Sequence, residues 1–86
     1  MDSKQAIKGK KVRCINATFK DDSHFPFTMK QLVLPKRGSV YTIRDVEKGS
    51  DNERGIRLEE IVNEKFPFTA VGMKEPMFLL QRFTAL

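Results

Sequence analysis

The chain contains a single cysteine, Cys14, among its 86 residues, and this excludes two common ways of stabilising a small domain. An internal disulfide needs two cysteines, and a structural zinc site needs more ligands than one cysteine and one histidine supply. A chain of this length has room for one hydrophobic core. The fold must therefore rest on packing within one domain, and we expect Cys14 to be a small buried hydrophobic residue of that core.

Short stretches in which apolar and polar residues alternate predict strands. They are separated by turn-rich segments, "PKRG" and "KGSDNERG", and by two long connections, residues 17–37 and 63–77. We expect strands at residues 11–16, 39–47, 55–62 and 78–80, and a short last strand within 81–86. Small all-β domains commonly remove their open edges by curling into a barrel. The sequence thus predicts an all-β fold, a small five-stranded barrel with two long loops.

The segment "RLEEIVNEKF", residues 57–66, has two interpretations. Its apolar residues stand at acceptable helical spacing, but Gly55 and the turn before it favour a strand. In a strand, Ile61 shares a face with Leu58 only if Glu59 and Glu60 form a bulge. We predict the strand with that bulge, and the helix remains the alternative.

The order of these segments resembles a group of small bacterial and phage-borne proteins of uncharacterised function that look like Src-homology-3-type barrels. The resemblance extends from about Val12 to Phe83. It is carried by "VRCI", "PKRGSVYTI", "GIRLEEI" and "FLLQRF", with the matching positions Cys14, Gly38, Tyr41, Ile43, Gly55, Leu58, Glu59, Glu60, Ile61, Arg82 and Phe83. The resemblance implies the barrel fold. It implies no activity, and the second long connection and the basic amino end depart from the pattern.

The formal net charge of +5 comes from the amino end: residues 1–20 hold six Lys or Arg and one Asp, and the remainder holds ten of each sign. We predict a basic flexible arm, residues 1–10, before a single domain, residues 11–86. The candidate nucleic-acid contacts are Lys8, Lys10, Lys11, Arg13, Lys36 and Arg37, because such side chains release counterions from phosphates. A solvated, solubilising surface is the alternative interpretation.

The tetrapeptide Phe-Pro-Phe-Thr occurs twice, at residues 25–28 and 66–69, and the similarity does not extend beyond it. Proline fixes its own φ and pushes the preceding residue into an extended conformation. Each copy is therefore expected to be a stiff segment that projects its two rings to similar sides. The four candidate partner-binding residues are Phe25, Phe27, Phe66 and Phe68. They either complete the core or line a groove for an extended peptide, single-stranded bases or a second copy of the chain.

No nucleophile motif, phosphate-binding glycine loop or metalloprotease helix is present. The only histidine, His24, follows two acids in "DDSH", a pattern more typical of a surface turn than of a metal site, which needs partners from elsewhere in the chain. Glu59 and Glu60 are neighbours on a strand and point to opposite faces unless bulged. We therefore expect no enzyme, no metal and no cofactor.

These observations predict a small non-enzymatic binding or adaptor module. Its expected partner is an unknown protein or an extended peptide bound through the aromatic loops, and the alternative is a nucleic-acid-binding accessory protein that uses the basic arm. The amino end is too polar for a signal peptide, and no apolar run reaches the about 20 residues of a membrane span. We expect a cytoplasmic protein without a membrane partner, either monomeric or a weak homodimer.

Overall fold

A computed structural model describes residues 1–48, 54–69 and 72–86. The described residues form strands and short 3-10 turns, which confirms the predicted all-β class. The strands are β1 (Lys11–Cys14), β2 (Val40–Lys48), β3 (Arg54–Leu58), β4 (Phe66–Phe68), β5 (Gly72–Lys74), β6 (Phe78–Leu79) and β7 (Phe83–Ala85), and the 3-10 turns are η1 (Ser3–Gln5), η2 (Met29–Gln31) and η3 (Leu80–Arg82).

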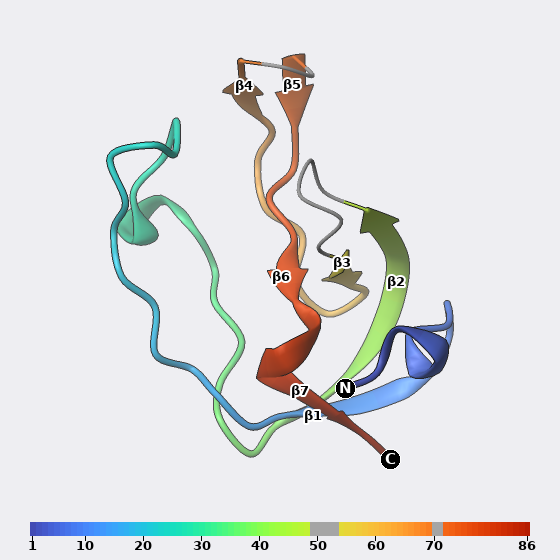
Figure 1. Cartoon of the computed structure of the whole chain (residues 1–86). Coiled ribbons are helices and arrows are strands. Elements are labelled where there is room, and N and C mark those ends of the chain that lie inside the picture. Colours follow the sequence, from blue (N-terminus) through green and yellow to red (C-terminus); the bar gives the residue numbers. More distant parts are fainter. Residues whose placement is uncertain (49–53, 70–71) are drawn as a thin grey trace.

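Five strands make one antiparallel sheet in the order β6-β3-β2-β1-β7, and β4 and β5 form a separate hairpin (Figure 1). The prediction of five strands in a closed barrel is therefore wrong in count and in closure. The two extra strands come from the second long connection. Closure fails because β6 has only two residues and η3 follows at once, which leaves no extended chain to pair with β7.

The open sheet is nevertheless strongly curved. A flat sheet would separate its edge strands by four spacings, about 19 Å in total. The chain from Leu79 to Phe83 joins those edges and spans at most about 14 Å even when fully extended. The edges β6 and β7 must therefore curl toward each other around the core.

Strand β2 changes its partner and its facing at Arg44. Its first half pairs with β1 and its second half with β3, and the register against β3 shifts between Ile43 and Asp45. A two-residue step on β2 thus opposes a one-residue step on β3. This irregularity is a β-bulge, and it changes the direction of the side chain of Arg44. Ile43 and Val46 consequently both face inward although they are three residues apart.

The bulge predicted at Glu59 and Glu60 is not within a strand, because β3 ends at Leu58. The chain bends at these two glutamates and continues as irregular structure to Lys65, so neither the longer strand nor the alternative helix is present. Ile61 is buried all the same. The bend, and not a bulge in the ladder, turns its side chain inward.

The core lies between the two halves of the curved sheet. Its buried members are Val12, Cys14, Tyr41, Ile43, Ile56, Leu58, Ile61, Phe78, Leu80 and Phe83. Cys14 is fully buried, as predicted. A side chain at Gly55 would displace Met77, because a Cβ atom there would lie 2.5 Å from the side chain of Met77.

The first ten residues lie against the sheet. The amino group of Met1 donates hydrogen bonds to the carbonyl oxygens of Phe83 (2.9 Å) and Leu80 (3.3 Å), and Gly9 N–H donates to Ile43 O (2.8 Å). Met1 and Ala6 pack against the core. The segment predicted as an arm is thus in contact with the domain that begins at β1. The described residues contain no helix with the length and apolar character needed to cross a membrane.

Candidate functional site

The two Phe-Pro-Phe-Thr segments meet in space, 41 residues apart in sequence. Phe27 is the central ring: its centroid lies 5.1 Å from that of Phe25, 5.1 Å from that of Phe66 and 5.9 Å from that of Phe68. Phe25 and Phe27 are stacked with planes 5° apart. All four predicted rings therefore form one aromatic cluster, here defined as Phe25, Phe27, Phe66 and Phe68, which is separate from the core of the sheet.

Burial differs along each segment. In the first, Phe25 is 44% exposed and Phe27 is 8% exposed; in the second, Phe66 is 7% exposed and Phe68 is half-buried. The cluster thus has a buried centre, Phe27 and Phe66, that serves packing. Phe25 and Phe68 remain accessible to a ligand.

Local hydrogen bonds hold the first segment in place. Asp21 Oδ1 accepts from Met29 N–H (2.6 Å), and Asp22 Oδ1 accepts from His24 N–H (2.9 Å) and lies 2.8 Å from His24 Nδ1. Thr28, which precedes η2, donates from its N–H to the side chain of Gln31, the last residue of η2 (2.8 Å). The bonds from the backbone and ring of His24 lower the pKa of Asp22, and the "DDSH" acids thus act as acceptors that shape a loop.

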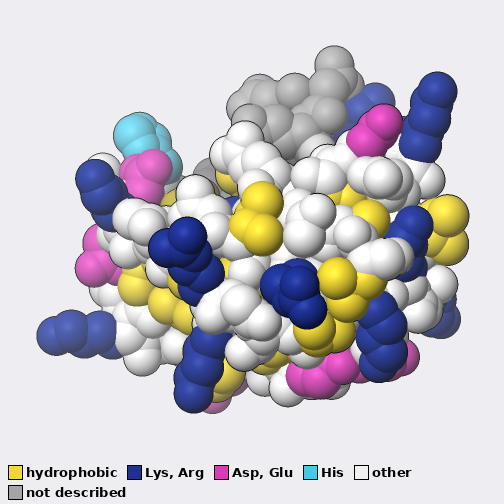
Figure 2. All heavy atoms as spheres, turned by 90° about the horizontal axis from the view of Figure 1, so that it is seen from below, with side chains coloured by type: hydrophobic (Ala, Val, Ile, Leu, Met, Phe, Trp, Pro, Cys, Tyr) yellow, Lys and Arg dark blue, Asp and Glu magenta, His cyan; other side chains and the backbone are white. Residues whose placement is uncertain are grey.

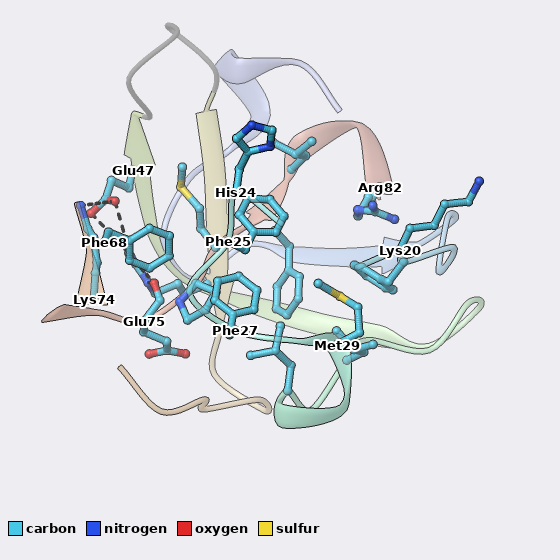
Figure 3. Close-up of a pocket in the computed structure, with 18 of the residues that line it drawn as sticks. Lys20, His24, Phe25, Phe27, Met29, Glu47, Phe68, Lys74, Glu75 and Arg82 are labelled. Atoms are coloured by element: carbon cyan, nitrogen blue, oxygen red, sulfur yellow. Dashed lines mark hydrogen bonds and ion pairs between the residues drawn. The ribbon is translucent and has the colours of Figure 1, made fainter. Parts of the chain in front are cut away.

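A pocket of about 700 Å³ opens beside the aromatic cluster (Figure 3). One wall belongs to the first long connection, and the other is formed by residues 68–69, 74–79 and 82 together with Glu47 and Lys48 of β2 and Arg57 of β3. Its apolar lining consists of Phe19, Phe25, Phe27, Met29, Leu32, Leu34, Phe68, Pro76, Met77, Phe78 and Leu79. Predominantly apolar walls with a few polar groups and this volume are typical of sites that bind a ligand. Phe66 does not line the pocket.

An ion-pair network closes one end of the pocket. Glu75 accepts two hydrogen bonds from Arg44, Nη1 to Oε1 (2.9 Å) and Nη2 to Oε2 (2.6 Å), and Arg57 donates twice to the backbone carbonyl of Glu75 (2.7 and 3.0 Å). Glu47 pairs with Lys74 and Arg57. Burial raises the pKa of both glutamates, but the hydrogen bonds and the nearby cations outweigh it, so that each pKa lies below its ordinary value.

Asn63 ties the two long connections together. Its side chain accepts from Val33 N–H (2.7 Å) and donates to Val33 O (3.0 Å), and its own N–H donates to Glu75 Oε2 (3.1 Å). The sequence prediction did not include Asn63, Arg44, Arg57 or Glu75. The one signal available was the three-residue step from Ile43 to Val46, which requires a bulge and so a re-aimed Arg44.

The other end of the pocket is formed by Arg82 and Lys20, which Figure 3 shows opposite Glu47 and Lys74. Arg82 Cζ lies 3.9 Å from the centroid of the Phe19 ring, a cation–π contact. Its Nη1 donates to Thr18 O (2.8 Å). Arg82 therefore holds the start of the first connection against η3.

The six predicted nucleic-acid contacts are arranged along β1. Lys11 and Arg13 are exposed on the strand, and Lys8 and Lys10 precede it. The turn with Lys36 and Arg37 adjoins its other end, since Gly38 N–H donates to Cys14 O (2.7 Å), with Gly38 at a φ of 88° that favours glycine. Figure 2, which views this side from below, shows Lys and Arg scattered among hydrophobic and polar groups.

One acid, Glu60, is linked to that basic surface through Thr42. Lys11 Nζ donates to Thr42 Oγ1 (2.5 Å), and the same threonine donates from its hydroxyl (2.8 Å) and its backbone N–H (2.7 Å) to Glu60. Burial raises the pKa of Glu60, but these bonds and the charge of Lys11 lower it by more, so the pKa lies below its ordinary value. Glu59 and Glu60 thus do not form a paired acid site: Glu60 anchors the bend after β3.

Within residues 1–48, 54–69 and 72–86, no three His, Cys, Asp or Glu side chains gather closely enough to hold a metal ion. His24 has Asp22 as its neighbour and is largely exposed. Comparisons of the chain with protein-family models, with curated proteins and with solved structures found no match.

Proposed function

We propose that the protein is a non-enzymatic binding module that holds an extended segment of a partner protein in the pocket beside the aromatic cluster. The observation that carries the proposal is the 700 Å³ apolar pocket with Phe25 and Phe68 accessible in its walls. Aromatic-lined grooves bind extended peptides because the rings offer large contact areas with few rotatable bonds. We place the protein in the cytoplasm, as a monomer or a weak homodimer.

The same proposal relates the open, curled sheet to the Src-homology-3-like barrels of the bacterial and phage-borne group that the sequence resembles. Its support is the curled sheet in which β7 returns to pair with β1 and a three-residue turn joins the two edges. In this interpretation the β4–β5 hairpin is an insertion that supplies the second aromatic segment. A solution structure with β6 and β7 far apart would contradict it.

A phage-displayed library of random peptides tests the proposed function. We expect enrichment of peptides rich in apolar residues, and shifts of the amide signals of Phe25, Met29 and Phe68 when the best peptide is added to ¹⁵N-labelled protein. The double substitution Phe25→Ala and Phe68→Ala is expected to weaken binding about tenfold or more while the domain stays folded. Phe27 is a poor target, since its burial makes unfolding the expected result.

The matched control is Val62→Ala, because Val62 is 68% exposed and does not line the pocket. It is expected to bind the selected peptide like the wild type. Selection that enriches no peptide, or shifts that centre away from the pocket, would contradict the proposed function.

Nucleic-acid binding is the second candidate, and the alignment of six cations along and beside β1 favours it. Titration of the labelled protein with a short single-stranded oligonucleotide at low and at physiological salt tests it. Shifts centred on Lys11 and Arg13 that weaken steeply with salt, and that vanish in the double variant Lys11→Gln and Arg13→Gln, would support it. Unchanged spectra at both salt concentrations would exclude it.

A further inference from the structure

The pocket is electrostatically asymmetric. Five cationic side chains line it, Lys20, Lys48, Arg57, Lys74 and Arg82, against the carboxylates of Glu47 and Glu75. Both carboxylates lie at one end and are already bound by Arg44, Arg57 and Lys74. The charges of these two carboxylates are therefore compensated within the protein.

Arg82 at the opposite end has unused hydrogen-bonding capacity. A guanidinium group has five N–H donors, and the acceptors of Arg82 in the described part of the chain, Asn16 and Thr18, are all bonded by Nη1. Among the described residues no carboxylate lies within 4 Å of Arg82 or Lys20, whereas Arg57 and Lys74 at the other end are paired. Within the described part of the chain, Nε and Nη2 have no acceptor and can donate to a ligand.

The Arg82 guanidinium is also held in a fixed orientation. The Phe19 ring lies under it at 3.9 Å and the bond to Thr18 O fixes one edge. A planar donor group that is held in advance loses little freedom when it binds a carboxylate through two parallel hydrogen bonds. Lys20, next to Phe19 in sequence, adds a second positive charge at this end.

We propose that Arg82 is the anchor for a carboxylate of the bound peptide, so that the pocket selects extended peptides in which an acidic residue neighbours an apolar or aromatic one. This inference rests on the proposed function and predicts the orientation of the peptide in the pocket. The acidic group lies at the Arg82 end, and the apolar side chain lies against Phe25 and Phe68.

The test uses two small probes of nearly the same shape, phenylacetate and phenylacetamide, titrated into the ¹⁵N-labelled protein at physiological salt. Phenylacetate is expected to bind about tenfold or more tightly than the amide, because hydrogen bonds to charged groups are stronger than those between neutral groups. The Nε–H signal of Arg82 is expected to shift with phenylacetate only. This readout needs no substitution.

Variants then assign the preference to Arg82. Arg82→Gln is expected to abolish the preference for the carboxylate over the amide, and Arg82→Lys, which keeps the charge without the planar donors, to retain part of it. The control Arg13→Gln removes the same formal charge from β1, outside the pocket lining, and is expected to keep the full preference. If Arg82→Gln loosens the first connection, the lysine variant and the Nε–H signal of the wild type show whether Arg82 binds the carboxylate.

Equal affinity for the two probes, or a carboxylate preference that survives Arg82→Gln, would overturn the anchor. Failure of both probes to bind would overturn it as well. The peptide selection tests separately whether the pocket binds peptides. If it enriches apolar peptides without an acidic residue, the proposed function is supported and the role of Arg82 is excluded.

Discussion

The two Phe-Pro-Phe-Thr segments share four residues but use their rings in opposite order. In the first, the second ring is buried and the first is exposed; in the second, the first ring is buried and the second lies in the pocket wall. Their backbones also differ, because residues 66–68 form β4 and residues 25–27 lie in an irregular loop. The same local sequence thus has two structural roles.

This difference separates local from long-range causes. The proline stiffens both segments in the same way, whichever surroundings they meet. Which ring is buried is set by the partner: Phe27 is surrounded because Phe25, Phe66 and Phe68 all face it. Where the cause is long-range, substitutions are expected to change the free energy of unfolding by unequal amounts in the two segments. Where the cause is local, the changes are expected to be equal.

The largest effect is expected at the buried centre. Phe27→Ala removes the ring that touches the other three, and should lower the free energy of unfolding by about 3–5 kcal/mol. Phe25→Ala should cost less than about 1 kcal/mol, because that ring is 44% exposed. Urea unfolding followed by circular dichroism measures both. Equal losses at the two positions would break the asymmetry drawn from the structure.

The network that positions the second segment comes next. Glu75→Gln leaves Arg44 without its carboxylate in a partly buried site, and should lower the free energy of unfolding by about 1–3 kcal/mol. Hydrogen exchange should accelerate at the amides of β4 and β5 before those of β2. Glu64→Gln is the matched control, since Glu64 is exposed. Faster hydrogen exchange confined to the amides of β1 and β7 would contradict this role of Glu75.

Much of the sheet was predictable, because alternation is a local signal. The inward positions Val12, Cys14, Tyr41, Ile43 and Ile56 follow from it, and all are buried. The contact between the two aromatic segments was predictable only as one of several arrangements. The stiffness of each segment and the direction of its rings depend on the local sequence, whereas the packing of one segment against the other depends on residues far apart in the chain.

The polar network was not predictable from local patterns. Arg44 and Glu75 are 31 residues apart, and Asn63 and Val33 are 30 apart. Charged residues in a strand and a loop are ordinarily solvent-facing, and nothing near Glu75 marks it as the partner of Arg44. The bulge was misplaced for a related reason: an apolar residue out of register, such as Ile61, can be turned inward by a bend as well as by a bulge, and the bulge lies instead at the three-residue step between Ile43 and Val46.

Lowering the pH should reduce the free energy of unfolding by less than the Glu75→Gln substitution does. The pKa values of Glu47, Glu60 and Glu75 lie below their ordinary value of 4.5 in the folded state. Their stabilisation is therefore complete above about pH 4.5 and is lost as the pH falls through the folded pKa values. The urea midpoint of the wild type should decline between pH 5 and pH 3, and that of Glu75→Gln should decline less. Parallel curves would show that Glu75 does not contribute.

The smallest effects are expected at the two prolines, and they test the local half of the comparison. Pro26→Ala and Pro67→Ala each free the unfolded chain and should each lower the free energy of unfolding by about 0.4–1 kcal/mol. Because this cost arises in the unfolded state, it should be the same in the loop and in β4, although the neighbouring rings differ by several-fold in their contributions. Pro67 opposes Met73 in the hairpin, where alanine supplies a backbone N–H that proline lacks. If urea unfolding shows a loss at Pro67 well below that at Pro26, the added N–H strengthens the pairing of β4 with β5, and the two prolines do not contribute equally.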